Sequence, residues 1–251
     1  MESTDVGRIT DVHSHLLWGV DDGAASLDES LRMCEAYVAE SVETVVATPH
    51  MAHPVYNVPR PLILERVAEL RDASRRRGLG LSILPGGDVH LQPDLLPMLD
   101  SGNLMTVADG GVYLLLELPE QGLPPLADLV FQLQVRGITP VVTHPERHAP
   151  LVRRPQYLAE LVERGCLAQV TAGALLGEFG RSARRAAERF LAGGLAHVVA
   201  SDAHSASGPR SPSFAPVRDR LASLVGPERA AQLLCANPGR LVRGEPMEPI
   251  E

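Results

Sequence analysis

The chain contains no lysine: all 23 of its basic side chains are arginine. This absence excludes Schiff-base catalysis and a P-loop, both of which need a lysine amine. It also excludes a metal pair bridged by a carbamylated lysine. Any phosphate-binding cation of the protein is therefore a guanidinium, which binds phosphate or carboxylate oxygens in a planar fork.

Cysteine is scarce, with three residues far apart in the sequence: Cys34, Cys166 and Cys235. An odd and scattered set does not form a disulfide framework and favours a reducing, cytoplasmic location. Cysteine-dependent phosphatase chemistry needs an arginine six positions after the cysteine in one loop. Those positions hold Glu40, Ala172 and Leu241, so the spacing excludes that chemistry and predicts core thiols.

Long apolar runs and excess positive charge are also missing. No run approaches the roughly 20 apolar residues of a membrane span, and the first residues lack the apolar region of a signal peptide. We therefore expect no membrane insertion and a cytoplasmic protein. The net charge of −8 disfavours a nucleic-acid groove, which needs a basic face.

Short β-like runs alternate with amphipathic helical stretches over the 251 residues. The strands are predicted at residues 9–13, 44–47, 81–84, 112–117, 139–143, 167–171 and 197–200. The helices are predicted at residues 26–40, 61–77, 126–136, 156–164, 181–191, 216–225 and 227–235, whereas residues 88–111 look irregular. This alternation predicts one α/β domain over residues 1–251, with a parallel sheet closed into a barrel. Its core spans about 8–240, and residues 1–7 and 245–251 are expected to be flexible.

The predicted strands repeatedly end in imidazole or carboxylate groups. The first ends in His13 and His15, which point the same way because strand side chains alternate with period two. In such barrels the carboxyl ends of the strands meet at the active site, so these groups are expected to converge. The candidate set is completed by Asp22, His50, Asp88, Glu117, His144, Asp202 and His204.

Together these side chains predict a metal centre. Taken singly, His50 or His144 could equally be a loop histidine, Asp22 a turn residue, and Glu117 the partner of an arginine. Their occurrence at six strand ends favours metal binding. Nitrogen and oxygen ligands without cysteine suit zinc, manganese or iron, and the number of candidates predicts two or three ions. Multinuclear sites of this kind suit phosphoryl displacement.

The motifs, in this order, resemble those of the PHP (polymerase and histidinol phosphatase) superfamily. The resemblance covers residues 9–210 and is carried by DVHSHLLWGVDDG, ATPH, PGGD, LLELP, THPER, QVTAGALLGEFG and VASDAH. Within that superfamily the chain is similar to the bacterial capsule-type, manganese-dependent protein tyrosine phosphatases. The resemblance implies a distorted (β/α)7 TIM-like barrel with a trinuclear centre of Mn2+, with iron or zinc as alternatives.

The resemblance also implies three ligand sets. They are His13, His15, Glu117 and Asp202; then Glu117, Asp88 and His144; then Asp22, His50, Asp88 and His204. Arg147 and Arg210 match the phosphate-binding arginines of the family, a role that suits a guanidinium fork.

The chain departs from the family pattern in two places. Aspartate stands at position 88, where the family usually has glutamate, so the bridging carboxylate is one methylene shorter. Met51 follows His50, where the family often has a second histidine. The next histidine, His53, is expected to be a solvated loop residue, and His90, His148 and His197 are expected to lie outside the centre.

The implied activity is metal-assisted hydrolysis of phosphotyrosine on a protein, a bacterial tyrosine kinase of polysaccharide synthesis. A homo-oligomer is compatible with this resemblance. One alternative is a histidinol-phosphatase-like or other small-molecule phosphoesterase. A second is an amidohydrolase, many of which need the carbamylated lysine that this chain cannot form. A third is a non-catalytic metal-binding or kinase-docking module, for which Asp88 is the only indication.

Overall fold

The computed structural model describes residues 8–247, so residues 1–7 and 248–251, part of the predicted flexible tails, lie outside the described residues. All seven predicted strands are present, with ends shifted by no more than two residues. They are β1 (Ile9–Ser14), β2 (Val42–Ala47), β4 (Ser82–Pro85), β6 (Tyr113–Glu117), β7 (Thr139–Thr143), β8 (Leu167–Thr171) and β9 (Val198–Ala200). Two short strands were not predicted, β3 (His50–Met51) and β5 (Asp88–His90).

The strands form a distorted barrel whose ladder is interrupted. Two parallel sheets carry the strand orders β1-β2-β4 and β3-β5-β6-β7-β8-β9. Thr44 pairs with Ser82 and His50 pairs with Asp88, so both sheets keep a spacing of 38 residues between partners (82 − 44 and 88 − 50). β3 and β5 therefore continue β2 and β4 beyond a break. The ring closes through one bridge between Ser14 and Ala203, where His15 N donates to Ala203 O at 2.9 Å.

Two glycines explain the break between β4 and β5. A Cβ on Gly86 would lie 2.7 Å from a methyl of Val46, and one on Gly87 would lie 2.4 Å from the sulfur of Met51. A side chain at either position would force its neighbour to shift, so glycine at both positions suits the close packing of the two broken strands. The irregular stretch predicted over residues 88–111 is thus a short strand followed by two helical segments.

Alternation along the strands separates an apolar interior from a polar mouth. One buried cluster inside the ring contains Val46, Leu115, Val141 and Val198. Two residues further along β6 and β7, on the same face, stand Glu117 and Thr143, and Asp202 follows the end of β9. Each strand therefore buries its amino end and presents a polar group at its carboxyl end, which is the architecture that positions a site.

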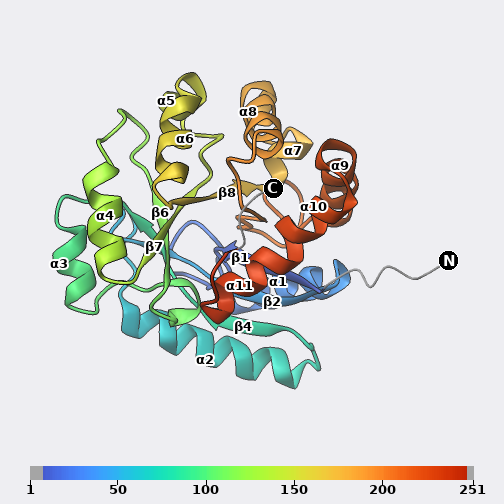
Figure 1. The fold of residues 1–251 in the computed structure, drawn as a ribbon. Coiled ribbons are helices and arrows are strands. Elements are labelled where there is room, and N and C mark those ends of the chain that lie inside the picture. The colour runs from blue at the N-terminus through green and yellow to red at the C-terminus, as the bar shows by residue number, and fades with distance from the viewer. Residues whose placement is uncertain (1–7, 248–251) are drawn as a thin grey trace.

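Helices surround the strands on the outside (Figure 1). The predicted ones are α1 (Leu27–Ala39), α2 (Arg60–Arg76), α4 (Ala127–Val135), α6 (Pro155–Glu163), α8 (Gly180–Ala192), α9 (Ala215–Val225) and α10 (Pro227–Ala231). The short α3 (Leu95–Asp100), α5 (Ala149–Arg153), α7 (Ala172–Leu176) and α11 (Asn237–Arg243) were not predicted. Ser26 caps α1 as expected, accepting a hydrogen bond from Glu29 N at 3.2 Å.

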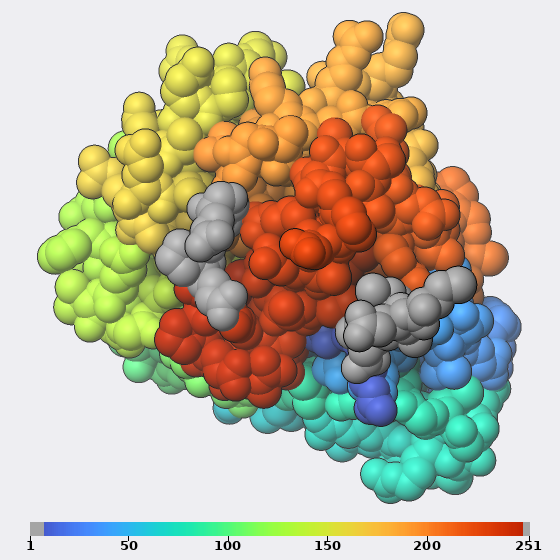
Figure 2. Space-filling model, turned by 45° about the vertical axis from the view of Figure 1, so that its right-hand side comes forward, coloured from blue at the N-terminus to red at the C-terminus, as the bar shows by residue number. Residues whose placement is uncertain are grey.

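The C-terminal helices close one side of the molecule. Figure 2 shows them in red, between the orange helical layer and the cyan α2. Leu241 of α11 joins the apolar cluster inside the ring. Within residues 8–247, none of the helices combines the length and apolarity that crossing a membrane requires.

Candidate metal centre

Five imidazoles and four carboxylates meet at the carboxyl ends of the strands. We refer to these nine side chains as the cluster; its members are His13, His15, His50, His144, His204, Asp22, Asp88, Glu117 and Asp202. The structure thus brings every ligand candidate from the sequence into one place. Most of them are buried, and the side chain of Asp22 is the most exposed carboxylate at 36%.

Asp202 stands where the barrel closes. Its Oδ1 lies 3.4 Å from Nε2 of both His13 and His15, and 3.7 Å from Nδ1 of His204. Its backbone N donates to His13 O at 2.9 Å, so the ring closure itself fixes this carboxylate beside the histidine pair.

Asp88 stands in the middle of the cluster. Its Oδ2 lies 3.6 Å from His13 Nε2, 3.7 Å from His50 Nδ1 and 4.0 Å from His144 Nε2. Its Oδ1 accepts a hydrogen bond from Thr143 Oγ1 at 3.2 Å. The aspartate, although shorter than glutamate, lies near imidazoles from three strand ends. Its Oδ1 is fixed by Thr143, and its Oδ2 accepts no hydrogen bond.

Asp22 and Glu117 complete the cluster. Asp22 Oδ1 lies 3.3 Å from His204 Nε2 and 3.5 Å from His50 Nε2. Glu117 Oε2 lies 3.4 Å from His50 Nδ1, and its Oε1 lies 3.8 Å from His144 Nε2. Carboxylates and imidazoles therefore alternate around a closed circuit.

Seven residues of the cluster form three overlapping groups whose ligand atoms lie within 4.8 Å of one another, and His144 and Asp202 belong to none of these groups. The groups are His15, Asp22, His50 and His204; then His13, His15 and Asp88; then His50, Asp88 and Glu117. The grouping differs from the implied sets at Glu117, which among the described residues contacts His50 and His144 instead of His13 or His15. Glu117 extends from β6, which lies across the ring from β1, and the carboxylates beside His13 are those of Asp202 at 3.4 Å and Asp88 at 3.6 Å.

The turn after β1 orients His15 through a carboxylate that the sequence analysis did not assign. Asp21 Oδ2 pairs with His15 Nδ1 at 2.8 Å and accepts from His50 N at 3.1 Å. A Cβ on Gly23 would lie 2.1 Å from His15 O, so the turn needs glycine to pack here. Asp21 thereby leaves His15 Nε2 directed at the cluster. The Asp-Asp-Gly motif after the first strand was the feature of the sequence that could have indicated the role of Asp21.

Gln169 orients the imidazole ring of His13 in the same way. Its Oε1 lies 2.9 Å from His13 Nδ1, which fixes the tautomer and leaves Nε2 as a lone-pair donor. Gln169 follows Leu167 by two residues on β8 and so shares its inward face. A polar residue at that inward position was the signal in the sequence.

The backbone is strained where the ligands are presented. His144, Asp202 and Arg210 have φ values of 36°, 52° and 59°, in the left-handed region that favours glycine. Each such residue costs about 1–3 kcal/mol, a cost that is typical of functional sites. The strain turns these three side chains toward the cluster at the ends of their strands.

Buried ligand atoms without a hydrogen bond test whether a cation fits the cluster. Within residues 8–247, four buried ligand atoms lack any hydrogen-bond partner: His50 Nδ1, Asp88 Oδ2, Glu117 Oε2 and His204 Nε2. Buried polar groups in native proteins are nearly always satisfied. Bound cations would satisfy all four atoms, and a donor set of nitrogen and oxygen suits manganese, iron or zinc.

The carboxylates of the cluster also favour bound positive charge, as the pKa values of two of its histidines indicate. Burial lowers the pKa of His50, but Asp22 and Glu117 outweigh burial and raise it to about 11. Burial likewise opposes the proton on His15, yet Asp21 and Asp202 raise its pKa to about 9. Protons on these imidazoles balance the carboxylates here, and divalent cations would replace those protons.

Arg147 and Arg210 border the cluster together. Arg147 Nη1 lies 2.5 Å and Arg210 Nη2 lies 3.2 Å from Asp202 Oδ2, the oxygen that faces away from His13 and His15. The Arg147 guanidinium also covers the ring of Phe179 at 4.4 Å. Both guanidiniums are about 30% exposed, so they can bind an anion at the mouth of the cluster.

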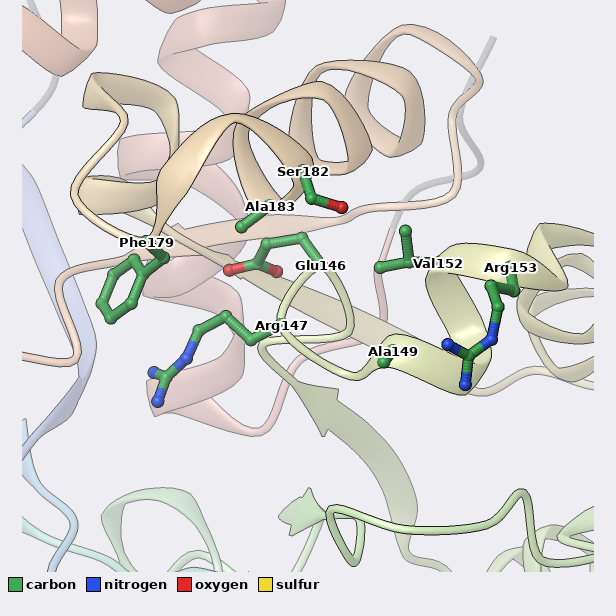
Figure 3. Close-up of a pocket in the computed structure, with 8 residues that line it drawn as sticks. All are labelled: Glu146, Arg147, Ala149, Val152, Arg153, Phe179, Ser182 and Ala183. Carbon is green, nitrogen blue, oxygen red and sulfur yellow. The ribbon is translucent and has the colours of Figure 1, made fainter.

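A pocket of about 420 Å³ lies behind Arg147 (Figure 3). Figure 3 shows the Arg147 side chain and the Phe179 ring on the same side of this pocket, with Arg153 on the other side. Glu146 is buried in it and accepts a hydrogen bond from Thr171 N at 2.9 Å. This bond ties the loop after β7, which presents His144 and Arg147, to the end of β8.

The remaining histidines and the cysteines lie elsewhere, with one exception. His148 caps α5, and His197 lies between β8 and β9, so both are outside the cluster as expected. His53, expected to be a solvated loop residue, instead stacks on His50 at 4.7 Å. Burial raises the pKa of Cys34 and Cys166 to about 12, which keeps these core thiols protonated and unreactive.

Comparison with known proteins identifies relatives of the whole chain. Tyrosine-protein phosphatase YwqE of Bacillus subtilis is 34% identical over 78% of this chain and 77% of its own length. Tyrosine-protein phosphatase CpsB of Streptococcus pneumoniae is 27% identical over 92% of this chain and 97% of its own. A lactonase of Listeria monocytogenes has a TM-score of 0.56 at 16% identity, a likeness of fold alone.

The fold and the family are shown by two further matches. Crystal structures of YwqE and CpsB, described as metal-dependent tyrosine phosphatases, superpose with a TM-score of 0.91 at 30% identity over 96% of both chains. The profile of the family described as capsular polysaccharide synthesis, CpsB/CapC, matches residues 9–243. The chain belongs to the CpsB/CapC family.

Proposed function

We propose that the protein is a metal-dependent phosphatase that hydrolyses phosphotyrosine in proteins, with the cluster as its metal centre. The cluster of four carboxylates and five imidazoles, in which four buried ligand atoms lack a hydrogen bond, carries this proposal. The relatives YwqE and CpsB are tyrosine-protein phosphatases, which supports the substrate class.

Seven of the nine cluster residues form the three overlapping groups, and together with His144 and Asp202 beside them they would hold up to three ions. We propose Mn2+, with iron or zinc as alternatives. Bound ions of this type activate water and neutralise charge on phosphate oxygens. Nine ligands exceed the coordination capacity of a single ion, which favours a multinuclear centre.

The chain's own residues bind and orient the ester. Arg147 and Arg210 approach the same oxygen of Asp202, so both guanidiniums can also converge on a phosphate beside it. Asp21 and Gln169 hold His15 and His13 in fixed orientations, which keeps the ligand geometry constant through turnover.

The proposed substrate is a tyrosine kinase of polysaccharide synthesis, and the proposed compartment is the cytoplasm. The family's description supports the polysaccharide context. The described cysteines are all free, which suits a reducing compartment.

The test is hydrolysis of p-nitrophenyl phosphate by metal-stripped protein before and after addition of Mn2+. We expect activity to require the ion, to disappear with a chelator, and to be lost in His15→Asn. The matched control is His148→Asn, which removes an imidazole outside the cluster while an amide oxygen can still cap α5. Full activity of the metal-free protein, or none with any divalent ion, contradicts the proposal.

The same preparation separates the substrate classes. A phosphotyrosine peptide should be hydrolysed with a higher kcat/KM than histidinol phosphate. The reverse order would assign the protein to small-molecule phosphoesterases of the histidinol-phosphatase type.

A further inference from the structure

Aromatic rings continue outward from the cluster along the loop between β3 and α2. The ring of His53 stacks on that of His50 at 4.7 Å and 26°, and the ring of Tyr56 lies 5.9 Å from His50 at 10°. His53 and Tyr56 are themselves 5.8 Å apart at 20°. Three nearly parallel rings therefore lead from a cluster residue toward solvent, since His53 and Tyr56 are half-buried.

This loop is held rigidly. Ala52 adopts a φ of 55°, its N donates to Asn57 Oδ1 at 3.0 Å, and its O accepts from Gln92 Nε2 at 2.9 Å. The ring of His90 meets that of His53 edge-on at 5.2 Å. Because these contacts hold the loop in one conformation, binding on it would cost little conformational entropy.

His53 carries one free donor. Its Nδ1 accepts hydrogen bonds from Val55 N at 3.2 Å and Tyr56 N at 3.3 Å. Those bonds place the ring proton of the neutral imidazole on Nε2. Among residues 8–247, nothing accepts a hydrogen bond from that atom, so it is available to an oxygen of a bound molecule.

We infer that His53 and Tyr56, which we call the aromatic shelf, form a subsite for the aryl group of the phosphate ester. This inference rests on the proposed function, because the ester must first place its phosphate at the cluster. His50 links the two sites: it contacts Asp22 and Glu117 and also carries the stacked ring of His53. An aryl ring lying on the shelf extends the existing stack, at the 4.5–7 Å spacing that aromatic pairs prefer.

The shelf also fits a protein substrate. Val55, at the tip of the same loop, is 74% exposed and lies next to the shelf. An apolar side chain at that place can contact the peptide on either side of a phosphotyrosine. An alkyl ester, such as that of phosphoserine, has no ring to stack, so the shelf selects among phosphoesters by their leaving group.

The test compares two phosphonates that differ only in the ring. Affinities of Mn2+-loaded protein for phenylphosphonate and methylphosphonate are measured by calorimetry, with bound metal quantified for each variant. Tyr56→Leu and His53→Asn should each weaken phenylphosphonate by about threefold to tenfold and leave methylphosphonate unchanged. The asparagine keeps an acceptor for the loop amides, and Tyr56→Phe, which keeps the ring, should retain the wild-type preference.

Phe131→Leu is the matched control, since it removes an aromatic ring that is 59% exposed on α4. The ratio of kcat/KM for phosphotyrosine over phosphoserine peptides should fall in the two shelf variants and not in this control. An unchanged phenyl preference in both shelf variants, or equal losses for both phosphonates at equal metal content, overturns the inference. Failure of the proposed function looks different, because the wild type would then hydrolyse no phosphate monoester while phosphonate binding still reports on the shelf.

Discussion

Asp202 divides its two oxygens between two tasks. Oδ1 faces His13 and His15, and Oδ2 is held by Arg147 and Arg210. The guanidiniums therefore stabilise a ligand carboxylate while remaining partly exposed to an incoming anion. A phosphate that binds there would contact the same two guanidiniums that hold Asp202 Oδ2. The contacts of Oδ1 with His13 and His15 would stay unchanged.

We predict that Arg147→Ala lowers kcat/KM for p-nitrophenyl phosphate by roughly a hundredfold, the usual effect of removing one preorganised donor. Bound metal should stay at the wild-type level, because Arg210 still holds Asp202 Oδ2 and Oδ1 is untouched. Steady-state kinetics and metal analysis check both statements. Arg153→Ala is the control, since Arg153 lines the same pocket and makes no contact with Asp202 among the described side chains. Loss of metal from Arg147→Ala would show that its role is structural.

The sequence predicts which residues meet more reliably than how they group. Side chains alternate along a strand, and the carboxyl ends of parallel strands meet at one edge of the barrel. Imidazole and carboxylate groups at the predicted strand ends were therefore expected to converge, and this identified all nine cluster residues from the sequence. The partners of Glu117 depend on which strands face each other across the ring, and a linear sequence does not show this. His53 was assigned to solvent because its stacking depends on the turn at Ala52, whose positive φ no local pattern indicates.

At the scale of elements, the two broken strands distinguish this barrel from a regular one. β3 and β5 comprise two and three residues, too short for a periodic signal. They nevertheless carry His50 and Asp88 and pair these two residues directly in register. The Gly86-Gly87 pair was visible in the sequence as part of the PGGD motif, whereas its close packing against Val46 and Met51 became apparent only in the fold.

His197 joins two elements and gives a pH prediction. It lies at the start of β9, where its Nδ1 accepts from Ala168 N at 3.2 Å and its O accepts from Asn237 Nδ2 at 2.8 Å. Burial lowers its pKa to about 4, from 6.5 in an unfolded chain. Between these values the unfolded state binds the proton and the folded state does not, so this residue makes stability fall as the pH falls from about 6.5 to 4.

We predict that His197→Asn reduces the loss of unfolding free energy between pH 8 and pH 5 by about 2 kcal/mol, at 1.36 kcal/mol for each unit of pKa difference. Denaturant unfolding of both proteins at the two pH values measures this, in a buffer with chelator so that metal does not contribute. Comparing slopes with pH cancels any constant effect of the substitution. A pH dependence identical to the wild type would mean that His197 is not buried neutral.

At the scale of the whole molecule, the cluster replaces part of the missing ladder. The barrel is closed by a single bridge and broken between β2 and β3 and between β4 and β5. Cluster residues come from β1, β3, β5 and β6, and from the segments after β1, β7 and β9. Ions held by ligands from all these elements would link strands that few backbone hydrogen bonds connect. A parallel sheet closed into a barrel was predictable from the alternation of strands and helices, but the two breaks in its ladder were not.

Metal binding should therefore stabilise the entire fold. An ion present at 100 times its dissociation constant adds about 2.7 kcal/mol, which corresponds to roughly 5–10 °C in Tm for a chain of this size. The size of the effect should depend on pH. The pKa of His15 is raised to about 9 in the folded, metal-free protein, so its stabilising proton is fully present below 6.5 and is lost as the pH rises toward 9.

A ligated imidazole carries no proton on its ligating nitrogen, so the metal-loaded protein does not suffer this loss. We predict that the difference in Tm between Mn2+-loaded and chelator-treated protein is larger at pH 8 than at pH 6.5, measured by thermal unfolding in matched buffers. Asp88→Asn should nearly abolish the difference at both pH values, because it removes the charge of the carboxylate that faces His13, His50 and His144. A Tm difference that is equal or smaller at pH 8 would mean that protons do not substitute for ions in the cluster. The arginines would then balance the charge of its carboxylates instead.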